Sequence, residues 1–290
     1  MTSISFIVTC QREKKYIRES VNSVLQQKGF ENDIEVIVVA CNTDKETLAE
    51  IPEDAEVIEI EDKNISEARN IGASQCSGDY IFFQDADDIS AEDRVQKSLP
   101  YLETYDIVGQ CLTTMEHINS NGEVIRDFKT VESLRKNRGE NFNPCSKNRI
   151  FENTIILPST LACKKEFASW NKSFPMAEDF EYLVRHVKNG ADVEILTENL
   201  CSRRMHEKQV TNTKELEIEK YKKKVEKLHN LNLPSLKIQI SHPYRTMLQE
   251  LRESPKNGVD IGNEIARAAE EQIYKEYRKM ENKKRIMKLE

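Results

Sequence analysis

The chain has 290 residues, of which 38% are hydrophobic, so it can form one large domain or one domain with an appendage. Its 43 basic and 50 acidic side chains leave a net charge of -7, which excludes the global basic excess expected of a nucleic-acid-binding protein. The seven cysteines lie far apart, without a Cys-x-x-Cys pair or a zinc-binding spacing, as is typical of free thiols in a reducing compartment. Because the N-terminus shows no signal peptide and no run reaches transmembrane length, the sequence predicts a cytoplasmic protein.

Strands and helices alternate through the first hundred residues. The hydrophobic periodicity predicts strands at 3–8, 34–40, 56–60 and 80–83, and helices at 12–27, 44–51 and 66–75. The second of these strands is almost continuously apolar, as expected for a sheet that is buried on both faces. This order predicts an α/β fold with a doubly wound, mostly parallel sheet.

After residue 100 the pattern changes. Strands are predicted at 107–115, 154–163, 193–196 and 200–205, a hairpin turn at Asn121-Gly122, a loop-rich segment at 129–150 and a helix at 179–188. Pro158 lies inside one of these strands, which suggests an edge or a bend. From Thr213 onward Lys, Glu and Leu dominate, and helices are predicted at 213–231, 243–254 and 259–288. We therefore expect a domain of residues 1–212 and a helical C-terminal appendage of residues 213–290.

The last predicted helix is strongly basic. It carries seven Lys and Arg residues between positions 275 and 288, with Tyr277, Met280 and Met287 among them. The favoured interpretation is a solvated helix that packs one face on the core. The alternative is peripheral contact with the inner face of a membrane or with a partner protein.

Three carboxylates follow the fourth predicted strand. Asp85, Asp87 and Asp88 stand at its carboxyl end, where open α/β sheets bind their ligands. Side chains two residues apart in a strand point to the same side, and two carboxylates so placed repel each other unless a cation lies between them. A divalent metal ion, with phosphates as its second partner, is the natural candidate. The alternative is an Asx turn or a helix N-cap, with Ser90 and Asp93 as a capping box.

Several motifs stand in one order along residues 3–206. They are Val36-Ile37-Val38-Val39, Ala68-Arg69-Asn70-Ile71-Gly72, Gly78-Asp79-Tyr80, Asp85-Ala86-Asp87-Asp88 and Glu178-Asp179. In this combination the sequence resembles family 2 glycosyltransferases, an inverting family with the GT-A fold. The resemblance implies a GT-A (nucleotide-diphospho-sugar transferase) domain that binds a nucleotide-sugar donor and transfers its sugar.

The resemblance assigns the metal site to Asp85 and Asp87. In the family this Asp-x-Asp motif holds Mn2+ or Mg2+ against the diphosphate of the donor, and Asp87 matches the direct ligand. A metal ion that bridges the phosphates stabilises the charge that develops on the leaving diphosphate. Some relatives carry a histidine after the last core strand that reaches the metal or the diphosphate, and His206 matches this position. A structural histidine is the alternative.

Three further residues are implied in nucleotide binding. Thr9 and Gln11 lie in the first strand-to-helix loop, where the family cradles the base and ribose, although such loops are also ordinary helix N-caps. Arg69 matches a position that approaches the nucleotide or its phosphates. The alternative for Arg69 is an ion pair with Asp79 or with a neighbour on its helix.

Two segments depart from the family pattern. Val8-Thr9-Cys10-Gln11 stands where many relatives have Pro-Thr-Tyr-Asn, and Ala40-Cys41-Asn42-Thr43-Asp44 stands where many have Asp-Asp-Gly-Ser. The aspartate that usually contacts the base is therefore missing, and Asn42 or Asp44 is expected to take its place. Family frequency alone favours UDP as the nucleotide.

The resemblance assigns the catalytic base to Asp179. An acceptor hydroxyl is a poor nucleophile, and removal of its proton by a general base typically contributes about 10²–10⁴-fold in rate. A single in-line displacement opposite the departing diphosphate inverts the anomeric configuration. The alternative for Glu178 and Asp179 is an acidic first helical turn that complements the helix dipole. Shortly before them, Trp170 could stack on an acceptor sugar or belong to the core.

Taken together, these features predict a cytoplasmic, metal-dependent, inverting glycosyltransferase. It would move a sugar from a nucleotide donor to a hydroxyl of a glycan or lipid-linked acceptor, in surface polysaccharide biosynthesis. A GT-A-like binding or scaffolding module without turnover is one alternative, motivated by the departures at 9–11 and 40–44. A nucleotidyltransferase is another, but it would usually carry a Gly-rich basic loop after the first strand, and Thr9-Cys10-Gln11-Arg12 contains no glycine.

Overall fold

The computed structural model describes residues 2–130, 132–134, 147–151, 155–207, 209 and 214–231. Contacts divide the chain into one unit of Met1–Arg135 and Asn141–Leu233 and a second unit of Lys136–Glu140 and Pro234–Glu290. All described residues belong to the first unit. The helices predicted at 243–254 and 259–288, including the basic one, lie outside the described residues, as does most of the loop-rich segment predicted at 129–150.

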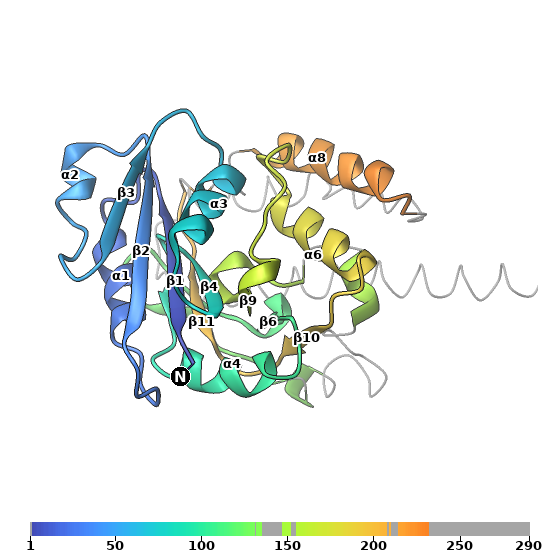
Figure 1. Cartoon of the computed structure of the whole chain (residues 1–290), viewed down its shortest axis with the longest axis horizontal. Coiled ribbons are helices and arrows are strands. Elements are labelled where there is room, and N and C mark those ends of the chain that lie inside the picture. Colours follow the sequence, from blue (N-terminus) through green and yellow to red (C-terminus); the bar gives the residue numbers. More distant parts are fainter. Residues whose placement is uncertain are drawn as a thin grey trace, which may run out of the picture. The chain divides into compact units, whose positions relative to one another are not determined.

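A main sheet of seven strands forms the centre of this unit. The strands are β1 (Ile4–Cys10), β2 (Ile34–Cys41), β3 (Glu56–Ile60), β4 (Tyr80–Asp85), β6 (Ile107–Gln110), β9 (Ala162–Lys164) and β10 (Val193–Leu196). They are arranged in the order β10-β6-β9-β4-β1-β2-β3 (Figure 1). Strand β9 runs antiparallel to β4 and β6, and the other neighbours are parallel, so the predicted mostly parallel sheet is confirmed.

Helices cover both faces of the main sheet. The helices are α1 (Ile17–Leu25), α2 (Lys45–Leu48), α3 (Ile65–Gln75), α4 (Arg94–Leu102), α6 (Glu178–Lys188) and α8 (Glu215–Leu228). Successive side chains of a strand point to opposite faces. Phe6 and Val8 of β1 therefore pack in one core cluster with α1 and α4, whereas Ile7 packs in another with α3 and α6. The two clusters confirm the doubly wound α/β architecture.

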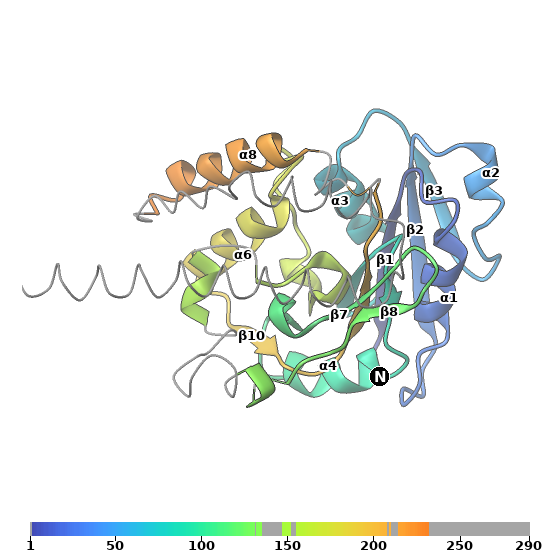
Figure 2. The ribbon, with the colours of Figure 1, turned by 180° about the vertical axis from the view of Figure 1, so that it is seen from behind.

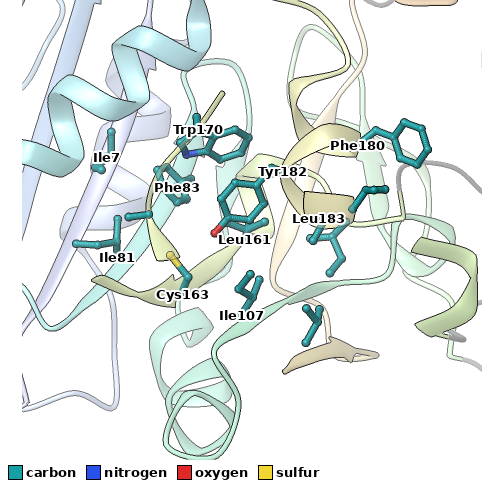
Figure 3. Close-up of a cluster of buried hydrophobic side chains, with 14 of the residues drawn as sticks. Ile7, Ile81, Phe83, Ile107, Leu161, Cys163, Trp170, Phe180, Tyr182 and Leu183 are labelled. Carbon is teal, nitrogen blue, oxygen red and sulfur yellow. The ribbon is translucent and has the colours of Figure 1, made fainter. Parts of the chain in front are cut away.

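Trp170 lies in the second of these clusters and not at the surface (Figure 3). It is 4% exposed. Its ring meets Phe83 of β4 edge-on, with centroids 5.1 Å apart, and stacks on Tyr182 of α6 at 4.4 Å. Offset and edge-on aromatic pairs stabilise a core beyond their buried area. The core interpretation of Trp170 is therefore confirmed, and the alternative that it stacks on an acceptor sugar is wrong.

A second, four-stranded sheet brings distant segments together. Its strands are β5 (Ile89–Ser90), β7 (Glu116–Ile118), β8 (Val124–Arg126) and β11 (Cys201–Arg204), in the order β5-β11-β7-β8. The predicted Asn121-Gly122 hairpin joins β7 and β8, and Gly122 takes the left-handed φ of +86° that this turn requires. Figure 2 shows this hairpin beside α1. Pairing of β11 with β5 places the residues after β11 close to those after β4.

Two predicted strands are shorter than expected. The strand predicted at 107–115 ends at Gln110, and a 3-10 turn follows at Leu112–Thr114, in which the Thr114 hydroxyl donates to the carbonyl of Cys111. The bounds of the strand predicted at 154–163 are also wrong. Pro158 opens the 3-10 turn Pro158–Thr160, and the strand in this region, β9, begins only at Ala162. Proline has no N–H for a sheet ladder, and threonine hydroxyls compete for backbone carbonyls.

Helix α1 also begins later than predicted, at Ile17 instead of residue 12. The Glu13 side chain accepts from the backbone N–H groups of Gln11 and Arg12, at 2.6 and 2.8 Å. These bonds hold the residues in a loop instead of a first helical turn. The strand-to-helix connection is therefore longer than the periodicity suggested, and it lies at the carboxyl end of β1.

Helix α8 packs on the segment that precedes α6. The Lys224 ammonium lies 4.6 Å from the centre of the Phe174 ring and donates to the carbonyl of Ser173 at 3.0 Å. After the helix, His229 approaches Glu181 of α6, with Nε2 and Oε1 3.4 Å apart. The compact unit extends to Leu233, so the boundary predicted after residue 212 falls inside it. Among the described helices, none has both the length and the apolar composition needed to cross a bilayer.

Gly78, in the Gly-Asp-Tyr motif, is expected to be intolerant of any side chain. A Cβ there would lie 2.5 Å from Ser5 Oγ and 2.6 Å from the Ser5 backbone nitrogen, and a backbone cannot move aside cheaply. We expect Gly78→Ala to lower the free energy of unfolding by about 1–3 kcal/mol, measured by urea denaturation. Exposed Ser74→Ala is the control and should change it by less than about 0.5 kcal/mol. Wild-type stability of Gly78→Ala would contradict the close approach of the β1 and β4 ends.

Candidate active site

Polar side chains gather at one edge of the main sheet, where three parallel strands end. In the register of the sheet, Thr9 of β1 lies between Val39 of β2 and Asp85 of β4. The residues that follow these strands therefore reach the same edge. This is the edge at which open α/β sheets bind ligands.

The segment Asp85–Asp88, here called the acidic loop, leaves β4 at this edge. Asp85 Oδ1 accepts from Arg69 at 2.9 Å, and Asp87 Oδ2 lies 2.9 Å from Nε2 of His206. Strand β4 ends at Asp85, so the alternation of a strand does not continue to Asp87. The prediction that strand alternation points Asp85 and Asp87 to the same side therefore does not apply, and the two carboxylates contact different partners.

Asp88 is the buried member of the acidic loop. It is 4% exposed and accepts from the Ser159 hydroxyl and from the backbone N–H of Arg204. Burial raises the pKa of the Asp88 carboxyl well above its usual value, and the Asp87 and Asp85 carboxylates raise it further. The neighbouring carboxylates therefore disfavour the charged form of Asp88, whereas a bound cation would favour it.

The capping-box alternative for this segment is wrong. Asp93 is the N-cap residue of α4, but its side chain makes no capping hydrogen bond and pairs with Lys97 at 2.8 Å instead. Ser90 lies in β5, where its backbone N–H donates to Ser23. The acidic loop is therefore separated from the start of α4 by a short strand and is not part of a helix cap.

Arg69 connects the acidic loop to the Glu-Asp motif. Its side chain is 3% exposed and pairs with Asp85 at 2.9 Å and Glu178 at 3.0 Å. The guanidinium lies 4.4 Å above the Trp170 ring. The ion pair with Asp79 that was considered from the sequence is wrong, because Asp79 accepts from Ser3 at the other end of β4. A role for Arg69 at the nucleotide stays a prediction.

Local sequence explains why Arg69 is held so firmly. Helix α3 begins with a complete capping box, in which the Asn64 side chain accepts from the N–H of Glu67 and Glu67 accepts from that of Asn64. The Asn64 amide also donates to the carbonyl of Lys172, in the segment that leads to α6. Helix α3 is thereby fixed to the segment that leads to the Glu-Asp motif.

Glu178 and Asp179 form the first turn of α6. The residue before them, Ala177, has the left-handed φ of 52°, which residues other than Gly, Asn and Asp seldom adopt. Burial raises the pKa of Glu178 to about 7, against the opposing effect of Arg69. The Asp179 carboxylate accepts from the N–H of Phe180 at 2.7 Å. Strain of this kind collects at functional sites, which supports a role for the turn beyond dipole compensation.

His206 reaches the acidic loop from the segment after β11. Its ring lies 5.1 Å from that of Tyr16, which precedes α1. With Asp85 and Asp87 it offers carboxylate oxygens and an imidazole nitrogen, a donor set that suits Mn2+, and carboxylates alone suit Mg2+. Among the described residues no three His, Cys, Asp or Glu side chains form a ready cage for a metal ion. One or two carboxylates completed by substrate phosphates are the usual arrangement for Mg2+, so the residues fit the group.

The residues predicted to bind the nucleotide lie at the same edge of the sheet, but they differ in exposure and in hydrogen bonding. Thr9 is 6% exposed, and its Oγ1 has no hydrogen-bond partner among the described residues. The Gln11 side chain is exposed. Asn42 has a left-handed φ of 51° and accepts from the N–H of Asp62 after β3. Asp44 caps α2 through the N–H of Thr47, so its carboxylate is engaged in local structure.

Several residues of the site had no assigned role from the sequence. Arg204 and Ser159 hold the buried Asp88, and Glu19 of α1 pairs with Arg204. The only sequence signal was the basic pair Arg203-Arg204 just before His206. Buried arginines are seldom distinguishable from exposed ones by sequence alone.

Comparison with known proteins identifies the family. Residues 5–157, more than half of the chain, match the family model described as Glycosyl transferase family 2. The chain belongs to this family. The O-antigen biosynthesis glycosyltransferase WbnJ of Escherichia coli is 27% identical over 219 residues, which cover 71% of this chain and 80% of the relative. The chain is a glycosyltransferase, which favours sugar transfer over the nucleotidyltransferase alternative.

Solved structures agree on the fold. Residues 1–349 of Staphylococcus aureus TarS in complex with UDP superpose with a TM-score of 0.55 at 16% identity, covering 80% of this chain and 67% of that one. A mannosyltransferase from Pyrobaculum calidifontis, in complex with GDP-Man and Mn2+, has a TM-score of 0.55 at 15% identity, covering 96% and 82%. The predicted GT-A fold of this family 2 glycosyltransferase is therefore confirmed.

Removal of the Arg69 side chain tests the link between the acidic loop and the Glu-Asp motif. We expect Arg69→Ala to lower the free energy of unfolding by about 3–5 kcal/mol, because it leaves two carboxylates without their cation. Urea denaturation measures the effect. Lys63→Ala is the control, since its exposed pair with Glu67 at 3.7 Å should contribute at most about 1 kcal/mol. Equal stability of the two variants would show that the Arg69 pairs are not formed in solution.

Proposed function

We propose that this family 2 glycosyltransferase is metal-dependent and inverting, and that it moves a sugar from a nucleotide-diphosphate sugar to a hydroxyl of a glycan or lipid-linked acceptor. A UDP-sugar is the proposed donor, and surface polysaccharide synthesis at the cytoplasmic side of a membrane is the proposed setting. The observation that carries the proposal is the 2.9 Å contact of His206 with Asp87, in the acidic loop that begins with Asp85 at the carboxyl edge of the sheet. Relatives support it: WbnJ is named for O-antigen biosynthesis, and TarS was solved with UDP-GlcNAc.

The acidic loop is the proposed place of the donor diphosphate. Asp87, with Asp85 and His206, would hold Mn2+ or Mg2+, and the ion would supply positive charge that stabilises the departing diphosphate. The complex of the Pyrobaculum calidifontis mannosyltransferase with Mn2+ supports this choice of cofactor. In our proposal Thr9, Gln11 and Asn42 bind the nucleoside. The buried Oγ1 of Thr9, unpartnered among the described residues, is suited to a hydrogen bond with the donor.

Asp179 is the proposed general base. Its carboxylate takes the proton of the acceptor hydroxyl while the hydroxyl oxygen attacks the anomeric carbon. The bond between that carbon and the diphosphate oxygen breaks in the same step, and the diphosphate leaves with the bonding electrons. Attack from the side opposite the leaving group inverts the anomeric configuration. The Arg69–Glu178 pair holds the start of α6 in place, so Asp179 is oriented before the acceptor arrives.

A screen of nucleotide sugars tests this proposal. Thermal unfolding and release of free sugar would be measured with UDP-, GDP- and other nucleotide sugars, with and without Mn2+. A ligand that binds only the native state raises its stability, by about 2.7 kcal/mol at a hundredfold excess over Kd. We expect one donor class to stabilise the protein, and to do so far better with Mn2+. Stabilisation without any turnover on candidate acceptors would favour a binding module, and no stabilisation by any donor would contradict the proposal.

A further inference from the structure

Arg204 is a buried cation that donates hydrogen bonds to the acidic loop. It is the last residue of β11 and is 1% exposed. Its Nε donates to the carbonyl of Asp87 at 2.8 Å, and its backbone N–H donates to Asp88 Oδ1 at 2.8 Å. One residue therefore holds two consecutive positions of the loop, one through its side chain and one through its backbone.

The other end of the same guanidinium reaches two further elements. Nη1 donates to the carbonyl of Asn119, at the start of the β7–β8 hairpin turn, at 3.1 Å, and Nη2 pairs with Glu19 of α1 at 2.5 Å. The Cζ atom lies 4.7 Å from the centre of the Tyr16 ring. The rigid fork of an arginine can make these contacts at once, whereas a lysine ammonium on a flexible stem cannot.

The position of His206 depends on the same residue. His206 follows Arg204 by two positions, and the intervening Met205 donates its N–H to the carbonyl of Ile118 at 2.8 Å. The imidazole Nε2 then lies 2.9 Å from the Asp87 carboxylate, while Arg204 donates to the backbone carbonyl of the same residue. The Tyr16 ring lies against both side chains, since its centre is 5.1 Å from that of His206.

We propose that Arg204 is a positioning residue that fixes the acidic loop and the His206 segment relative to each other before any ligand binds. The inference adds to the proposed function, because correct placement of Asp87 and His206 would set the affinity for the metal ion. The contacts themselves require no ligand, so they can be tested independently of metal binding.

Amide hydrogen exchange on the ligand-free full chain tests the inference. In Arg204→Lys, peptides that contain Asp88 and peptides that contain Met205 should exchange together, at least about tenfold faster than in the wild type, because charge-assisted hydrogen bonds are lost. Peptides of β1 and β2 should keep their wild-type rates. Arg185→Lys is the matched control: Arg185 also pairs with a buried carboxylate and donates to a carbonyl, but on α6, and it should leave both segments unchanged.

Unchanged exchange in either segment of Arg204→Lys would overturn the inference, as would an equal acceleration throughout the sheet. If Arg204→Lys does not fold, Glu19→Gln provides the test, because Glu19 is half-exposed and the fold should tolerate its loss. It should accelerate exchange in the same two segments by about two- to fivefold. Wild-type exchange of both segments in Glu19→Gln would then overturn the role of Arg204.

A Mn2+ titration separates this inference from the proposed function. With UDP present, the Mn2+ concentration that gives half of the rise in melting temperature should increase about tenfold in Arg204→Lys and stay unchanged in Arg185→Lys. An unchanged midpoint in Arg204→Lys would contradict its effect on the metal site. A wild-type protein that does not respond to Mn2+ would instead contradict the metal-dependent function, while the exchange result would still decide whether Arg204 positions the loop.

Discussion

Asp179→Asn is expected to lower the rate of sugar transfer by about 10²–10⁴-fold, the usual contribution of a general base. Asparagine has nearly the size of aspartate and can still accept the hydrogen bond from the N–H of Phe180, so the start of α6 should keep its shape. It cannot accept a proton at neutral pH. Initial rates with the donor identified by the screen and a verified acceptor measure the effect.

The binding properties of this variant separate chemistry from structure. Donor affinity should stay close to that of the wild type, because Asp179 is proposed to act on the acceptor and not on the donor. Asp54→Asn, an exposed aspartate between α2 and β3, is the control and should transfer sugar normally. A near wild-type rate for Asp179→Asn would show that Asp179 is only an acidic residue at a helix start and that another group is the base.

Asp87→Ala is expected to lower activity by about 10²-fold or more, since a metal ion contributes several kcal/mol to catalysis and each 1.36 kcal/mol is tenfold in rate. The variant removes a proposed ligand and also the partner of His206. The fold should survive, because Asp87 lies in a turn at the sheet edge and not in the core. Rates over a range of Mn2+ concentrations measure the loss.

Asp79→Ala is the matched control for this variant. Asp79 immediately precedes β4, at the end opposite the acidic loop, is exposed, and accepts from Ser3. Its loss should leave the dependence of the rate on Mn2+ unchanged. If Asp87→Ala showed the wild-type dependence as well, the assignment of the metal site to the acidic loop would be wrong.

The main sheet could be predicted because its strands are apolar runs with clear ends. Residues such as Phe6 and Ile7 are buried on opposite faces, so the run is continuous and its length gives the strand. The failures lie where polar side chains bond the backbone locally. The Thr114 hydroxyl bonds the turn that follows β6, Glu13 delays the start of α1, and Pro158 opens a turn. A hydrophobic pattern does not register such local features.

The candidate site could be predicted only in part. A strand that ends in Asp85, Asp87 and Asp88 indicates a ligand site by itself, and His206, which only the family resemblance pointed to, lies 2.9 Å from Asp87 in the structure. The contact of Arg69 with Glu178 joins residues 109 positions apart, and no local pattern records such a pair. The same is true of Arg204, whose contacts with Asp87 and Glu19 depend on the order of strands in the second sheet.

Titration calorimetry of the donor with three proteins tests the central claim most directly, because it separates the donor site from the base. Binding of the nucleotide sugar would be measured with and without Mn2+ for the wild type, Asp87→Ala and Asp179→Asn. The account predicts Mn2+-dependent binding by the wild type, the same affinity for Asp179→Asn, and loss of the Mn2+-dependent part for Asp87→Ala. Unchanged Mn2+ dependence in Asp87→Ala, or loss of donor binding in Asp179→Asn alone, would contradict it.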